Sequence, residues 1–201
     1  MEPALRGLQG IERFAVIQRI TPMVNRYDIR ATSSDGQPGA LLATAQQKRL
    51  AFKEAVTFYA DEARTVPVFS FTARKRLDLG SGYDVLDAQG NRIGSFRKDF
   101  GASLLRSTWH LEAPGLTATG AERNATVAVL RRAWNLVPVL GDLPAPFVVH
   151  FDFSEGDGRR VLTSTRKVSA RDSYDVHVPG ARVDGRLAAA MAVALDALQG
   201  R

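Results

Sequence analysis

Asp184-Gly-Arg-Leu-Ala-Ala-Ala-Met-Ala-Val-Ala-Leu-Asp-Ala-Leu-Gln199 is the most informative stretch of this sequence. Its large apolar residues recur at helical spacing: Leu187, Met191, Leu195 and Leu198. Alanine or valine fills most of the positions between them, so the predicted helix is apolar nearly all round. Asp184 is suited to cap its N-terminus. We therefore expect a helix that is buried on nearly every side.

The length of this helix indicates burial in protein rather than in a membrane. About 14 residues at 1.5 Å each span roughly 21 Å, whereas a bilayer core needs about 30 Å and close to 20 apolar residues. Asp196 would also lack a partner in lipid. We predict that residues 187–198 form a buried C-terminal helix at the centre of one soluble, mostly-β domain.

Most of the remaining chain consists of short segments rich in alternating or β-branched apolar residues, separated by Gly, Asp and Asn turns. Strands are expected within residues 14–20, 26–32, 83–87, 92–97 and 103–111, and as a pair within the more ambiguous residues 41–61. The clearest hairpin is Tyr83-Asp-Val-Leu-Asp-Ala-Gln-Gly-Asn-Arg-Ile-Gly94, where Gly90 can supply the positive φ of the turn. Helical spacing and Pro138 favour a second helix over residues 122–135.

A short phrase recurs three times: Tyr27-Asp-Ile29, Tyr83-Asp-Val85 and Tyr174-Asp-Val176. A weak repeat of this kind fits a barrel assembled from similar hairpins, although three short matches also arise by chance.

The 83–94 hairpin, Phe96-Arg-Lys-Asp-Phe100, Ser103-Leu-Leu-Arg-Ser-Thr-Trp109 and the terminal apolar helix occur in an order that resembles the tubby C-terminal-like superfamily, in its LURP-one-related and phospholipid-scramblase-like branch. The resemblance covers about residues 14–198 and implies a closed antiparallel β-barrel of about twelve strands around a central hydrophobic helix. We expect a single domain over residues 1–201, with residues 1–12 as a flexible leader. The resemblance also implies a non-enzymatic intracellular protein, cytoplasmic or peripheral to a membrane. The absence of cysteine and of a Pro-rich N-terminal tail disfavours scramblase activity.

The charge balance allows an anionic partner. The net charge is +6 with a pI near 10.0, which suits nucleic acid or anionic lipid headgroups, although an arginine-rich composition also arises from genomic base composition. The candidate phosphate- or lipid-binding residues are Arg74, Lys75, Arg76, Arg97, Lys98 and Arg106. We expect a binding or scaffold domain whose partner is an anionic lipid headgroup or another protein, with nucleic acid less favoured.

Signals of catalysis or metal binding are weak. The histidines are far apart, the acidic residues 152–157 fit a hairpin turn better than a calcium loop, and no nucleophile elbow, P-loop or dinucleotide motif occurs. We therefore expect no catalytic residue, no cofactor and no metal ligand. The alternative is a small-ligand-binding or catalytic barrel, which would require space beside the helix.

Overall fold

A computed structural model describes residues 7–20, 24–33, 35–48, 55–74, 82–99, 107–123, 150–167 and 173–199. The strands are β1 (Arg13–Ile20), β2 (Val24–Thr32), β3 (Pro38–Lys48), β4 (Ala55–Tyr59), β5 (Pro67–Ala73), β6 (Tyr83–Asp87), β7 (Arg92–Asp99), β8 (Thr108–Ala113), β9 (Leu116–Glu122), β10 (His150–Ser154), β11 (Arg160–Lys167) and β12 (Ser173–His177). A single α-helix among these residues, α2 (Gly185–Gln199), follows the last strand.

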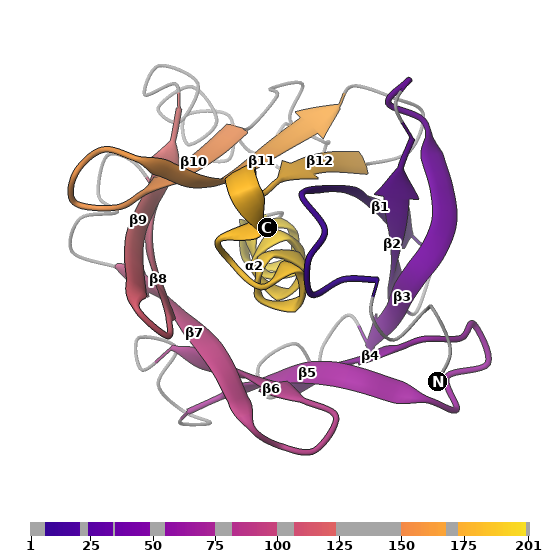
Figure 1. The fold of residues 1–201 in the computed structure, drawn as a ribbon. Coiled ribbons are helices and arrows are strands. Elements are labelled where there is room, and N and C mark those ends of the chain that lie inside the picture. Colours follow the sequence, from indigo (N-terminus) through magenta and orange to yellow (C-terminus); the bar gives the residue numbers. More distant parts are fainter. Residues whose placement is uncertain are drawn as a thin grey trace, which may run out of the picture.

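The twelve strands form one closed antiparallel barrel. Each strand pairs with its neighbours in sequence, and β1 pairs with β12 to close the ring. Figure 1 views the barrel roughly along its axis and shows α2 at its centre. The prediction of a mostly-β barrel around the C-terminal helix is confirmed, and closure leaves no free sheet edge in it.

Sequence alternation locates the strands better than it locates the helices. The ambiguous residues 41–61 contain parts of two strands, β3 and β4, as expected. The predicted helix over 122–135 is wrong at its start, because Glu122 ends β9 and pairs with Phe151 of β10. Ladder pairing with a neighbouring strand outweighs the helical spacing here. Residues 124–135 of that prediction lie outside the described residues.

Helix α2 fills the barrel with its apolar side chains. Every residue from Leu187 to Leu195 is at most 4% exposed, as the all-round apolar pattern predicts. The helix also packs close to the wall: a Cβ atom on Gly94 of β7 would lie 2.5 Å from Leu187. Glycine at this position therefore permits the close approach of helix and strand.

The two ends of the barrel differ in their connections. The tight turns, such as the β6–β7 turn with Gly90 at φ 86°, lie at the end where α2 begins. At the other end, Asp196 near the C-terminus of α2 lies beside Tyr27 and Tyr174 at the starts of β2 and β12. We call the two ends the helix-start end and the helix-finish end.

The N-terminal residues 7–12 cover the helix-start end. Leu8 is 5% exposed, and its carbonyl oxygen would lie 1.8 Å from a Cβ atom on Gly185. The carbonyl of Glu12 accepts a hydrogen bond of 2.7 Å from the backbone N–H of Val178. Asp184 caps α2 as predicted, because its carboxylate accepts a 2.9 Å bond from the backbone N–H of Arg186.

No helix in the described part of the chain is long and apolar enough to cross a bilayer.

Candidate functional site

The interior of the barrel is occupied by packed side chains and by one polar lock at the helix-finish end. Asp196 of α2 accepts hydrogen bonds from the hydroxyl groups of Tyr27, at 2.9 Å, and Tyr174. Burial, reinforced by the charge of Asp196, raises the pKa of Tyr27 well above its usual value. The tyrosines thus supply the partner that Asp196 would lack in lipid. An interior filled in this way directs the search for a site to the outer wall.

The repeated Tyr-Asp phrase has one structural meaning in all three strands. Tyr27, Tyr83 and Tyr174 point inwards and are at most 9% exposed. The aspartate that follows each tyrosine therefore points outwards, since successive side chains alternate across a strand. Each of these aspartates contacts an arginine: Asp28 with Arg19 at 2.7 Å, Asp84 with Arg92 at 2.9 Å, and Asp175 with Arg13 at 2.6 Å.

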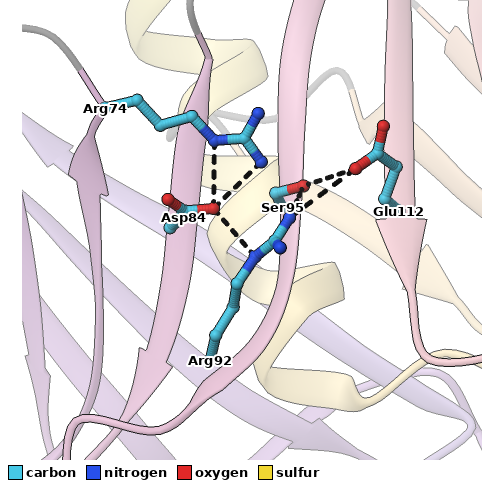
Figure 2. Close-up of polar contacts among 5 residues, drawn as sticks. All are labelled: Arg74, Asp84, Arg92, Ser95 and Glu112. Atoms are coloured by element: carbon cyan, nitrogen blue, oxygen red, sulfur yellow. Dashed lines mark hydrogen bonds and ion pairs between the residues drawn. The ribbon is translucent and has the colours of Figure 1, made fainter.

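The most extended of these outer networks runs from the residue just after β5 across β6, β7 and β8 (Figure 2). The guanidinium of Arg74, just after β5, donates to Oδ1 of Asp84 on β6 at 3.0 and 3.1 Å. Arg92 on β7 bridges from Asp84 to Ser95, whose hydroxyl it reaches at 2.8 Å. Ser95 in turn donates to Glu112 on β8 at 3.2 Å. Two arginines and two carboxylates thus balance within the network.

This balance changes the interpretation of Arg74. As a candidate for phosphate binding it was expected to offer a guanidinium to a ligand, but that group is already shared with Asp84. A ligand would have to compete with a carboxylate that makes two hydrogen bonds. Arg74 therefore serves first to join β5 to β6.

Arg97 is in a different situation. It lies on the outer face of β7, opposite His110 of β8, and is exposed. It makes no ion pair or side-chain hydrogen bond with any described residue, in contrast to Arg92 on the same strand and to Arg74 just after β5. Of the candidate basic residues that the structure describes, Arg97 is the one whose charge is available to a partner.

Lys98 lies on the opposite face of the same strand. Its ammonium group is 5.9 Å from the centre of the Trp109 ring, a distance at which a cation and an aromatic face attract each other. Trp109 itself is fully buried. Lys98 is only partly exposed, so its aliphatic chain covers the inner wall near the helix-finish end.

The described candidates lie close together in the fold. Arg74 follows β5, and Arg97 and Lys98 are near the end of β7, so they share the helix-finish end and one sector of the wall. Lys75, Arg76 and Arg106 lie outside the described residues. In sequence they adjoin the same strand ends, Lys75 and Arg76 after β5 and Arg106 before β8.

The histidines lie apart in three strands and form no common site. His110 is within 3.1 Å of Asp99 through Nε2 and 3.3 Å of Thr119 through Nδ1, which orients its ring on the outer wall. Burial, and to a smaller degree the charge of Arg123, lowers the pKa of His150. Within the described ranges no group of three or more His, Cys, Asp or Glu residues is arranged to hold a metal ion.

The acidic residues 152–157 form the β10–β11 turn and the strand before it. The turn is closed by a 2.9 Å bond from the backbone N–H of Glu155 to the carbonyl of Arg159. Asp152, on β10, accepts two 2.7 Å hydrogen bonds from the Arg123 guanidinium. The hydrogen bonds from Arg123 lower the pKa of Asp152. The interpretation as a hairpin turn is confirmed.

The sequence reasoning missed Asp84, Arg92 and Glu112 as parts of one network. The repeated Tyr-Asp phrase was the available signal, because an aspartate that follows an inward tyrosine must lie on the outer face. Arg92 and Glu112 carried no signal of their own, since their proximity depends on the register of β6, β7 and β8.

Comparison with known proteins gives one match. No curated protein and no solved structure matches this chain. A family model, LURP-one-related, matches residues 41–196, which run from β3 to the C-terminal part of α2. The match covers most of the chain and all but two of the strands in full or in large part. The chain belongs to the LURP-one-related family, within the tubby-like superfamily.

Proposed function

We propose that this barrel is a non-enzymatic binding domain that recognises anionic phospholipid headgroups through the outer wall near the end of β7. The observation that carries the proposal is the exposed guanidinium of Arg97, which has no ionic partner among the described residues. Neighbouring arginines on the wall are held by carboxylates, so Arg97 is the arginine of this sector with charge to offer a partner.

The chemistry of the surrounding sequence supports the same partner. In sequence, Lys75, Arg76 and Arg106 adjoin the strand ends beside Arg97. A basic residue near an anionic bilayer contributes about 1 kcal/mol, and this attraction decays within a Debye length. Attraction of this size for Arg97 and the basic residues near it in sequence would give weak, salt-sensitive attachment rather than insertion.

The packed interior also supports a surface ligand. The residues of α2 from Leu187 to Leu195 and the inward aromatic residues of the wall are buried against one another. An internal ligand would have to displace this core, at a cost of roughly 2–5 kcal/mol for each large side chain that is moved.

Vesicle sedimentation tests the proposal. The full chain is mixed with phosphatidylcholine vesicles alone, with added phosphatidylserine, or with added phosphoinositide, at low and at physiological salt. We expect recovery in the pellet only with the anionic vesicles, and less recovery as salt rises. Equal recovery in the supernatant for all three compositions at low salt would overturn the proposal.

A matched pair of variants locates the surface. Arg97→Gln should weaken vesicle binding about fivefold, the effect of about 1 kcal/mol. Arg159→Gln removes one positive charge from the β10–β11 turn at the helix-start end, and it should leave binding close to that of the wild type. If both variants reduce binding equally, net charge rather than this surface is responsible.

A further inference from the structure

A second basic feature lies on another sector of the outer wall, across β1, β2 and β3. It is a small concavity of about 20 Å³ that is partly open to solvent, and its lining residues include Arg19, Arg26, Gln46, Glu62 and Arg64. Arg97 and the network of Figure 2 belong to β5–β8 and take no part in it. The concavity is thus distinct from the proposed lipid-binding surface.

The strand register places two like charges opposite each other on its floor. Arg19 of β1 pairs with Arg26 of β2, and Arg26 pairs with Gln46 of β3. Like charges directly opposite in an antiparallel pair are destabilising. Arg19 is compensated by Asp28 at 2.7 Å. Arg26 is exposed and makes no ion pair with any described residue.

The wall of the concavity is a turn held in an unusual conformation. Arg64 has a φ of 60°, in the left-handed region that side chains other than glycine rarely adopt. The carboxylate of Asp61 accepts bonds from the backbone N–H groups of Thr65 and Val66, both at 2.9 Å, and so fixes the turn. Backbone strain of this kind persists where the surrounding structure enforces it, and it concentrates at functional sites.

Two acceptors lie among these donors. The side-chain oxygen of Gln46 is buried and has no hydrogen-bond partner, and Glu62 is exposed at the edge without an ion pair in the described part of the chain. Asp28, the other carboxylate of the lining, is already engaged by Arg19 and by the hydroxyl of Thr44 at 3.1 Å. Unsatisfied donors and acceptors therefore coexist in one small concavity.

We propose that this concavity binds a phosphate group through the guanidinium groups of Arg26 and Arg64, while Arg19 stays paired with Asp28. A tetrahedral oxyanion presents acceptors in several directions and can take donors from both arginines at once, whereas a planar carboxylate suits a single bidentate fork. Gln46 and Glu62 can accept from the acidic hydroxyl of a phosphate monoanion or from a hydroxyl group beside a phosphomonoester. The ligand is inorganic phosphate or a small phosphomonoester.

Titration of the full chain tests this site. Binding is measured by calorimetry and thermal unfolding with inorganic phosphate, with glycerol 3-phosphate, and with sodium chloride at matched ionic strength. We expect one saturable site and a rise in Tm with phosphate beyond the effect of sodium chloride. Tighter binding of glycerol 3-phosphate would identify a phosphomonoester as the ligand class, and tighter binding of inorganic phosphate would identify the free anion. No saturable binding of either would overturn the proposal.

Two variants separate binding from folding. Arg64→Gly removes a guanidinium and also relieves the positive φ, while Arg26→Gln removes the cross-strand repulsion with Arg19. Each should weaken phosphate binding about tenfold or more, and each should leave the Tm without phosphate unchanged or raised. A variant that keeps the wild-type affinity for phosphate would contradict the assignment.

Arg97→Gln serves as the matched control. It should leave phosphate binding at the wild-type level while it weakens vesicle binding. Conversely, the double variant Arg26→Gln/Arg64→Gly should retain preferential binding to anionic vesicles. Failure of one proposal is therefore distinguishable from failure of the other.

Discussion

The inner and outer faces of the barrel wall are built from alternate residues of the same strands, yet they are held by different forces. On the inner face, residues such as Phe71 and Trp109 are fully buried against one another and against α2. On the outer face, carboxylates of one strand contact arginines of the next, as Asp84 contacts Arg74 and Arg92. Buried side chains of the size of Phe or Leu contribute about 1.5–3 kcal/mol each, whereas exposed ion pairs contribute about 0–1 kcal/mol.

Because of this difference, the inner face contributes most of the stability, and the outer face carries the charges on which the binding proposals depend. Changes to the inner face disturb a close-packed core, while changes to the outer face alter charge with little effect on folding. Substitutions on the outer face can therefore change which arginines lack an ionic partner at little cost in stability. Arg97 and Arg26 are the two such positions on which the binding proposals depend.

The largest effect should follow from Met191→Asp, which places a carboxylate in the middle of α2. Met191 is fully buried, and an unpaired buried charge costs about 3–5 kcal/mol or more, against a total stability of about 5–15 kcal/mol. We expect loss of soluble folded protein, measured by expression in the soluble fraction and by circular dichroism. Met191→Leu is the control and should fold. A Met191→Asp variant as stable as the wild type would refute the central position of the helix.

Much of this inner face could be predicted from the sequence. The apolar residues of α2 recur on all sides, and a helix of that kind requires a surrounding shell. Alternating apolar residues in segments such as residues 83–87 predict the strands of that shell. Side chains repeat every two residues along a strand, so Tyr83 and Val85 lie on one face. The helix predicted from residue 122 was wrong at its start, because β10, the partner that makes Glu122 part of a strand, lies 28 residues away along the sequence from Glu122 to His150.

A smaller effect should follow from Asp196→Asn, which weakens the polar lock between α2 and the wall. An amide oxygen can replace one carboxylate oxygen, but the charge that strengthens both tyrosine hydrogen bonds is lost. We expect a decrease of about 1–3 kcal/mol in the free energy of unfolding, measured by urea denaturation. Tyr27→Phe should cost a similar amount.

A double-mutant cycle shows whether the lock is one unit. The combination Asp196→Asn/Tyr27→Phe should cost less than the sum of the two single changes, because both remove the same hydrogen bond. Strict additivity would show that Tyr27 and Asp196 do not depend on each other.

The outer face could be predicted only in part. Basic residues near strand ends were visible in the sequence, and three of them are described at one end of the barrel: Arg74, Arg97 and Lys98. Whether each is free depends on carboxylates of other strands, and this pairing is set by register rather than by sequence distance. Arg74 finds Asp84, Lys98 covers Trp109, and Arg97 has no counterpart in the described residues. The concavity of Arg19, Arg26 and Arg64 carried no sequence signal, because β2 and the β4–β5 turn meet only in the fold.

The smallest effect should appear in the pH dependence of stability, on the outer wall around β10. Because burial and Arg123 lower the pKa of His150 in the folded protein, the unfolded chain binds a proton first as the pH falls below about 6.5. Stability should therefore decrease between pH 6.5 and the folded pKa, and remain constant below it. His150→Gln should remove this decrease, measured as the Tm across pH 7 to 5.

Arg123→Gln adds a second test, because it should change the stability of the protein in two separate pH ranges. Loss of its charge reduces the depression of the His150 pKa, so the decrease in stability below pH 6.5 should become shallower. Arg123 also lowers the pKa of Asp152 in the folded protein. The resulting contribution to the free energy of unfolding is fully present above about pH 3.9 and is lost as the pH falls through the folded pKa of Asp152. Arg123→Gln should therefore lower stability at neutral pH and flatten the loss below pH 4. If the Tm of His150→Gln still decreases below pH 6.5, another titrating group is responsible for the decrease, and His150 on β10 is not.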